Sequence, residues 1–251
     1  MSNINKHLSY AQKNCLSKAG RMLYKTSMLR PHSRVGIAVS GGMDSFVLAQ
    51  ILALHKRKLP FSVELMLLHV NPGFDPHHHT DLLHWVLHKG LASHFELSDM
   101  GPRAHSSENR KKSPCFFCSQ RRRKRLFELA KKYRLTHLAF GHNQDDLVAN
   151  FFMNMMYSGR IEGMYPKESF FQGEFELIRP LLGVEKRVIR RAAELWELPV
   201  RKNPCPSAEN TKRTEIDNWL NELKNRDKGV RKNIYSALLR WQMENQEPEN
   251  F

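Results

Sequence analysis

The chain has 251 residues, enough to bury one well-packed core or at most two small domains. Its 41% hydrophobic content is that of a globular protein, and no apolar run approaches the roughly 18–20 residues of a membrane span. Lys and Arg number 40 against 25 Asp and Glu, so the formal net charge is +15. Such an excess favours a polyanionic partner, above all nucleic acid, although solvated helix faces are the alternative for any one cluster of cations.

The cations gather in three clusters, at 110–125, 186–191 and 224–232. Residues 1–15 lack the apolar segment of a secretory signal, so we expect a cytoplasmic protein that does not enter a membrane.

Two kinds of apolar run alternate along the chain. Short aliphatic and β-branched runs predict strands at 35–40, 64–70, 94–99, 136–142 and 175–181. Longer runs predict helices at 45–57, 79–90, 121–134, 144–159 and 185–198, and only helical patterns follow residue 213. This alternation predicts an α/β fold, a parallel five-stranded sheet with helices on both faces. We expect helical extensions at 1–34 and 206–251 around an α/β domain at 35–205, and a long polar loop between 101 and 114.

The stretch VSGGMDS (39–45) joins the first predicted strand to the first predicted helix. Such a loop lies at the carboxyl edge of a parallel sheet, where these folds bind ligands. Gly41 and Gly42 allow a sharp turn that brings backbone N–H groups against an anion, and Ser40 and Ser45 add hydroxyl donors. The loop lacks the lysine of a Walker A motif, and Asp44 would repel phosphate unless a cation such as Mg²⁺ stood between them. The alternative is a plain tight turn before a capped helix.

Further motifs follow this loop in order. They are NPGF (71–74), CFFCSQRRR (115–123), GHNQDD (141–146), MMYSGRIEGM (155–164), IRPL (178–181) and NPCPS (203–207). With SGGMDS they resemble the motifs of the N-type ATP pyrophosphatases, or PP-loop superfamily, and within it those of the tRNA 2-thiocytidine synthetases. The sequence departs from that branch at Met43, where lysine is frequent, and at Ser207 and Ala208, where a further cysteine is common.

The resemblance implies a doubly wound ATP pyrophosphatase fold and ATP-dependent tRNA thiolation. The C2 oxygen of a cytidine in the anticodon loop would attack the α-phosphate of ATP, and sulfur would then displace AMP. The loop 40–45 would hold the departing pyrophosphate, with Asp44 on the side of Mg²⁺. Asp145 and Asp146 would bind Mg²⁺ or transfer a proton, although both could simply cap a helix. Arg122 would stabilise phosphate or the activated base.

Other positions match the family less directly. Gly141 and His142 are implied to contact the nucleotide, although a strand-end histidine satisfied by hydrogen bonds explains His142 nearly as well. His69 occupies the position that lines the adenine pocket, largely through its backbone. Arg179 and Arg213 match basic positions that are expected to contact phosphate.

The chain has four cysteines. The pair Cys115 and Cys118 fits zinc, redox or iron–sulfur chemistry, and three thiolates suit a 4Fe-4S cluster with one open iron. The resemblance implies that Cys115, Cys118 and Cys205 hold such a cluster, whose open iron carries the sulfur to be transferred. Persulfide or disulfide chemistry without iron and a zinc site stay as alternatives. Cys15 is expected to be a small buried apolar residue.

The implied partners are tRNA and a sulfur donor, either a cysteine desulfurase or sulfide, and relatives suggest a homodimer. Three other functions stay open: a tRNA lysidine synthetase-like ligase, which needs no cysteine cluster; thiolation of another base or a small molecule; and a basic RNA-binding protein with a relic loop. Two further patterns are expected to be structural. The run His77, His78 and His79 is expected to be solvated, and the Phe/Met stripe at 151–156 to be core.

Overall fold

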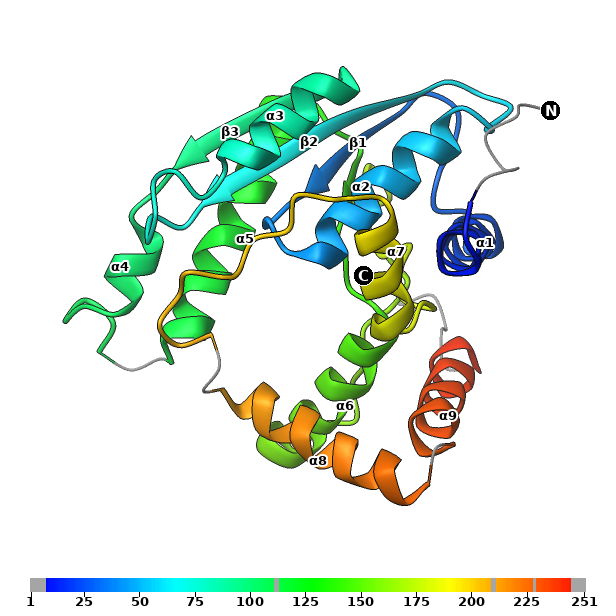
Figure 1. Ribbon diagram of the computed structural model, residues 1–251, viewed down its shortest axis with the longest axis vertical. Coiled ribbons are helices and arrows are strands. Elements are labelled where there is room, and N and C mark those ends of the chain that lie inside the picture. The colour runs from blue at the N-terminus through cyan, green and yellow to red at the C-terminus, as the bar shows by residue number, and fades with distance from the viewer. Residues whose placement is uncertain (1–7, 111–112, 209–210, 228, 245–251) are drawn as a thin grey trace.

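The computed structural model describes residues 8–110, 113–208, 211–227 and 229–244 (Figure 1). Its strands are β1 (Ser33–Ala38), β2 (Val63–Asn71), β3 (Ala92–Leu97), β4 (His137–Ala139), β5 (Lys167–Phe170) and β6 (Phe175–Ile178). Its helices are α1 (Tyr10–Lys25), α2 (Met43–Lys56), α3 (Thr80–Lys89), α4 (Met100–Ala104), α5 (Pro114–Lys132), α6 (Gln144–Ser158), α7 (Lys186–Leu195), α8 (Lys212–Arg226) and α9 (Val230–Glu244). Within these described segments, no helix has the length and apolar character needed to cross a bilayer. Lys111, Lys112 and Lys228 of the predicted basic clusters lie outside the described residues.

The strands form one sheet in the order β3-β2-β1-β4-β6-β5. Five of them run parallel, which confirms the predicted α/β fold, but β5 adds a sixth strand antiparallel to β6. The predicted count of five strands was therefore wrong by one edge strand. β5 has only four residues, and its pairing depends on a tight turn in which Phe171, Gln172 and Gly173 all have positive φ. So short a strand carries little periodicity of its own.

The direction of winding reverses at β1. β2 and β3 lie on one side of β1, while β4 and β6 lie on the other. This arrangement is the topological switch point at which doubly wound sheets bind ligands. The loops that follow β1 and β4 touch there, because a Cβ atom at Gly141 would come within 3.0 Å of the Asp44 carbonyl carbon. Glycine at 141 permits this close approach.

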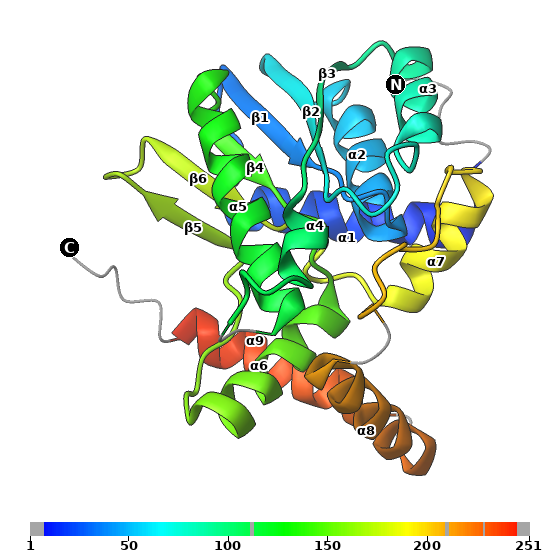
Figure 2. The same ribbon diagram turned by 90° about the vertical axis from the view of Figure 1, so that its left-hand side faces the viewer.

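Helices cover both faces of the sheet (Figure 2). On one face, Val35, Ile37 and Leu67 pack in a core shared with α1, α2, α3 and α7. On the other face, Leu68 and Val70 pack with residues of α5. Adjacent β2 residues point to opposite faces, so this strand is apolar on both sides, as expected for a covered parallel sheet. The segment predicted as a loop from residue 101 contains the short helix α4.

The C-terminal helices are anchored on α6. Leu147 of α6 shares a buried cluster with Ile216 and Leu220 of α8 and Leu238 of α9. Phe151, Phe152 and Met153 pack partly against this cluster, while Met155 and Met156 are exposed. The Phe/Met stripe is therefore core only in its first half. The predicted domain boundaries remain predictions.

Candidate active site

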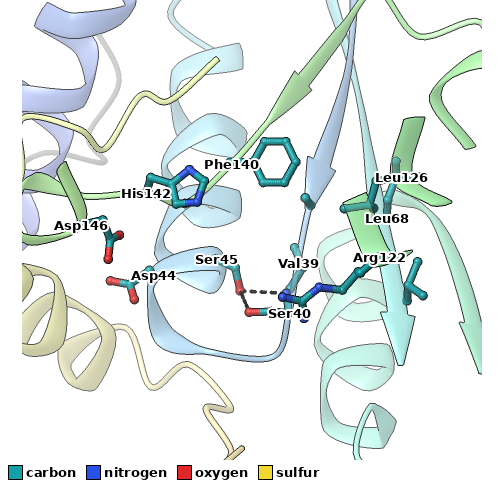
Figure 3. Close-up of a pocket in the computed structure, with 13 residues that line it drawn as sticks. Val39, Ser40, Asp44, Ser45, Leu68, Arg122, Leu126, Phe140, His142 and Asp146 are labelled. Atoms are coloured by element: carbon teal, nitrogen blue, oxygen red, sulfur yellow. Dashed lines mark hydrogen bonds between the residues drawn. The ribbon is translucent and has the colours of Figure 1, made fainter. Parts of the chain in front are cut away.

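A cavity of about 190 Å³ opens at the carboxyl edge of the sheet, beside the switch point. Residues after β1 and β4 meet residues of β2, α5 and α6 around it (Figure 3). Its polar and glycine lining residues are Ser40, Asp44, Ser45, Arg122, Gly141, His142 and Asp146. All seven are predicted site residues, although they come from three separate parts of the sequence, 40–45, 122 and 141–146.

The loop before α2 has the construction of an anion cradle. Gly41 has a φ of +88°, and Gly42 caps α2 without a side chain, so no cap side chain occupies the first N–H groups of the helix. The Ser45 hydroxyl donates to the Gly42 carbonyl at 2.8 Å and accepts from the Ser40 N–H at 3.2 Å. These two hydrogen bonds hold the loop open toward the cavity, where the helix dipole favours phosphate.

The carboxylates of Asp44 and Asp146 lie side by side at one end of the cavity and point toward one another (Figure 3). Burial, reinforced by the charge of Asp146, raises the pKa of Asp44 to about 6. The Asn143 amide donates to Asp44 at 3.0 Å and opposes this shift. Asp146 also accepts from the Asn143 N–H at 2.7 Å, closing a capping box at the start of α6, and pairs with Arg213. The two carboxylates are hard oxygen donors whose negative charges repel each other, so a Mg²⁺ ion bound beside both would be favoured.

Asp145 does not line this cavity. Its carboxylate accepts from the Lys186 N–H at 2.8 Å and pairs with Arg231 of α9. Asp145 therefore ties the start of α6 to the start of α7 and to α9. Successive helix residues point about 100° apart, so only one of the two adjacent acids can face the cavity.

His142 is held as a neutral ring. It stacks on Phe140 with an interplanar angle of 13°, and its Nδ1 accepts from Arg179 Nε at 3.2 Å. Burial lowers the pKa of His142 to about 4. Arg179 is itself bound to Glu168 at 2.6 Å, and Arg213 to Asp146, so both arginines serve protein carboxylates in this structure rather than standing free for phosphate.

His69 points away from the cavity that its neighbours Leu68 and Val70 line. Its ring is buried and donates from Nδ1 to the Val39 carbonyl at 2.8 Å. Burial lowers the pKa of His69 to about 4. Only the backbone of residue 69 is available to this edge of the sheet.

Arg122 extends from α5 toward Ser40 (Figure 3). Among the described residues it has no hydrogen-bond or ion-pair partner. An unpaired guanidinium opposite an anion cradle is available to a phosphate ligand.

Three free cysteines approach one another near this arginine. Cys115 and Cys118 lie in the first turns of α5, and the loop after α7 brings Cys205 back across the molecule to the same end of α5 (Figure 1). Burial raises the pKa of Cys115 and of Cys118, and the charge of Cys205 raises both further, while Arg122 opposes the shift at Cys118.

Three thiolates are the donor set that suits a 4Fe-4S cluster with one open iron. Within the described part of the chain, no three His, Cys, Asp or Glu side chains are placed to bind one metal ion. A cubane spreads its thiolate ligands over separate iron atoms, so its sulfurs stand further apart than those of a zinc site. Cys15, by contrast, is fully buried in α1, as predicted.

Three residues near the site differ from expectation or were missed. His78 is half-buried rather than solvated. It lies over Gly41, where an added Cβ atom would come 3.5 Å from the His78 Nε2. His79 is also engaged, because its Nδ1 accepts from the Asn71 amide at 3.0 Å. Asn143 was missed, although an Asn three residues before an acid at a helix start is a capping signal.

The chain is similar in sequence to proteins of known family. A PP-loop domain model matches residues 11–223. The tRNA-cytidine(32) 2-sulfurtransferase of Bordetella petrii is 31% identical over 224 residues, which cover 88% of this chain and 68% of the relative. That of Polaromonas naphthalenivorans is 29% identical and covers 90% and 73% of the two chains.

Solved structures share the fold. The U34-tRNA thiolase NcsA from Methanococcus maripaludis, solved with its [4Fe-4S] cluster, superposes with a TM-score of 0.74 at 23% identity, covering 95% of this chain and 82% of that one. The NH3-dependent NAD synthetase of Campylobacter jejuni superposes with a TM-score of 0.51 at 17% identity, covering 97% of this chain and all of that one. Because the PP-loop domain model matches most of the length of the chain, the chain belongs to the PP-loop domain family.

Proposed function

We propose that this protein is an ATP-dependent tRNA sulfurtransferase that converts a cytidine of the anticodon loop to 2-thiocytidine. One observation carries the proposal: Cys118 and Arg122 lie one turn apart on α5, and Arg122 lines the cavity that holds the anion cradle. Sulfur ligands and a nucleotide site thus adjoin. The curated relatives named tRNA-cytidine(32) 2-sulfurtransferase support the choice of substrate.

Activation of the base is the first step. The cytosine O2 attacks the α-phosphorus of ATP, and the bond to the bridging oxygen breaks, so pyrophosphate leaves. Ser40, Ser45 and the backbone of residues 41–42 hold the pyrophosphate, and Asp44 and Asp146 are the residues that would hold Mg²⁺. Arg122 neutralises the charge that develops on the phosphates. His142, held neutral by burial, orients the nucleotide or the base.

Sulfur transfer is the second step. A sulfur nucleophile at the oxidation level of sulfide attacks C2, and AMP leaves with the oxygen, so no net electron transfer occurs. Cys115, Cys118 and Cys205 would hold a 4Fe-4S cluster, which when bound supplies an open iron for that sulfur. Sulfur would come from a cysteine desulfurase or from sulfide. A homodimer in the cytoplasm completes the proposal.

Nucleoside mass spectrometry tests this function. Anaerobically purified protein, ATP, Mg²⁺, sulfide and unmodified tRNA should yield 2-thiocytidine, AMP and pyrophosphate in equal amounts. A colourless, iron-free protein that joins lysine to tRNA would instead establish the ligase. Thiolation of a different base would correct the substrate, and no AMP formation with any tRNA would contradict the enzyme itself.

A further inference from the structure

A larger hollow, of about 540 Å³, lies apart from the catalytic cavity, between α1 and α9. Figure 1 shows both helices on the side of the molecule opposite α5. Its rim carries five cations, Lys18, Arg21 and Lys25 from α1 and Lys232 and Arg240 from α9. We call this hollow the α1–α9 groove.

The charge of the α1–α9 groove is not balanced by the protein. Among the described residues, Glu185 is the only acid that lines the groove, and it pairs with Lys18 at 3.7 Å and with Arg187. The other four rim cations are exposed, and none forms a hydrogen bond or ion pair with a residue that the structure describes. Like charges gathered on two facing helices repel each other, so an anion with several charges would be favoured here.

The floor of the α1–α9 groove is largely apolar. Met22, Tyr235 and Leu239 form part of it. The Tyr235 hydroxyl has no hydrogen-bond partner among the described residues. Burial raises the pKa of Tyr235 to about 12, so the phenol stays a hydrogen-bond donor at neutral pH. An apolar floor with one donor suits a sugar or a base, while the rim suits phosphates.

We propose that the α1–α9 groove binds the sugar–phosphate backbone of the tRNA substrate, away from the transfer chemistry. This inference rests on the proposed function for the identity of the RNA. Gln144 lines the groove, whereas Asp146, two residues further along α6, lines the catalytic cavity. Two helical residues differ by about 200° in direction, so the sites lie on opposite sides of the start of α6. A long polyanion can reach both sites, which a mononucleotide cannot.

A second copy of the chain fits the groove less well. Closed dimers are usually two-fold symmetric, so each groove would face the same surface of its partner. If that surface were the groove itself, unpaired cations would face unpaired cations. RNA removes this repulsion and releases counterions from its phosphates.

Paired charge reversals test the groove. The double variant Arg21→Glu with Arg240→Glu removes two rim cations. The matched control is Lys131→Glu with Lys132→Glu, which changes the net charge equally at the exposed C-terminal end of α5, on the side of the molecule away from α1 and α9 (Figure 1). Filter binding of an unmodified tRNA transcript over a salt series gives Kd and its salt dependence, and sedimentation gives the oligomeric state.

The groove variant should bind the transcript at least about tenfold more weakly, with a log–log salt slope shallower by about 2, and should bind ATP as the wild type does. The control should change Kd much less. Equal losses in both variants, or an unchanged Kd in the groove variant, would overturn the groove. A change of oligomeric state without a change in Kd would assign the groove to a second copy and overturn the RNA proposal.

The binding assay also separates this inference from the function. A wild-type protein that binds tRNA through the groove but never thiolates it would refute the proposed function and leave the groove intact. Wild-type thiolation with unaltered RNA affinity in the groove variant would refute the groove alone.

Discussion

Asn143 and Asp44 are joined by a hydrogen bond of 3.0 Å that links the loops after β4 and β1. The same Asn143 side chain accepts from the N–H groups of Asp145 and Asp146 and so caps α6. One fully buried amide therefore sets both the orientation of the Asp44 carboxylate and the start of the helix that carries Asp146.

Substitution at Asn143 can separate these two tasks. Asn143→Ala loses the cap and the link to Asp44, and we expect the free energy of unfolding to fall by about 1–2 kcal/mol, together with ATP turnover. Asn143→Ser keeps an oxygen that can cap the helix but is too short to reach Asp44. Urea denaturation should show most of the stability restored in the Ser variant, while pyrophosphate release stays low. Full activity in Asn143→Ser would show that the link to Asp44 is unimportant.

Asp44 should lower the stability of the ligand-free protein at neutral pH. Its pKa is raised from 3.8 to about 6 by burial and by Asp146, so the folded state favours the protonated form. The contribution of protonated Asp44 to the free energy of unfolding is fully present below pH 3.8 and is lost as the pH rises through about 6. Asp44→Asn, which removes the charge, should therefore raise the free energy of unfolding by about 1–3 kcal/mol at pH 8 and by much less at pH 4.

The measurement for Asp44 is urea denaturation at the two pH values, with pyrophosphate release followed separately. The stabilised variant should be inactive, because it lacks the proposed Mg²⁺ ligand. An equal gain at both pH values would mean that the charge of Asp44 is not the cause.

Arg122 should matter for catalysis and not for stability, because it has no hydrogen-bond or ion-pair partner among the described residues. We expect Arg122→Gln to lower the rate of pyrophosphate release about 10²-fold and to leave the melting temperature unchanged. Arg123→Gln, at the exposed neighbouring position, is the control for loss of one charge. Equal rates for the two variants would place Arg122 outside the reaction.

Asp145, in contrast to Arg122, should matter for stability and not for catalysis. Asp145→Ala removes the acceptor of the Lys186 N–H and leaves Arg231 with the Asp217 carbonyl but without its carboxylate partner. We expect a loss of about 2–4 kcal/mol in the free energy of unfolding. The KM for ATP should stay within about twofold of the wild type, since the side chain does not line the cavity. A specific loss of ATP affinity in a fully folded Asp145→Asn variant would restore its predicted nucleotide role.

The sequence predicted the parts of this site that depend on strand ends. The loops after β1 and β4 could be placed together because parallel strands end at one edge, and Asp44 and His142 follow from that rule. The direction of Asp145 could not be predicted, because its partner Arg231 lies 86 residues away in the chain. The same holds for β5, which needs the turn at 171–173, and for His78, whose place over Gly41 depends on the path of the 72–79 loop.

Iron content in cysteine variants tests most directly whether three thiols share one cluster beside the nucleotide cavity. Anaerobic protein should contain about four iron atoms per chain, and Cys15→Ser, in the buried core of α1, should keep them. Cys115→Ser, Cys118→Ser and Cys205→Ser should each lose the cluster and 2-thiocytidine formation while still binding ATP. A Cys205→Ser variant with full iron content and normal cluster absorbance would contradict the account.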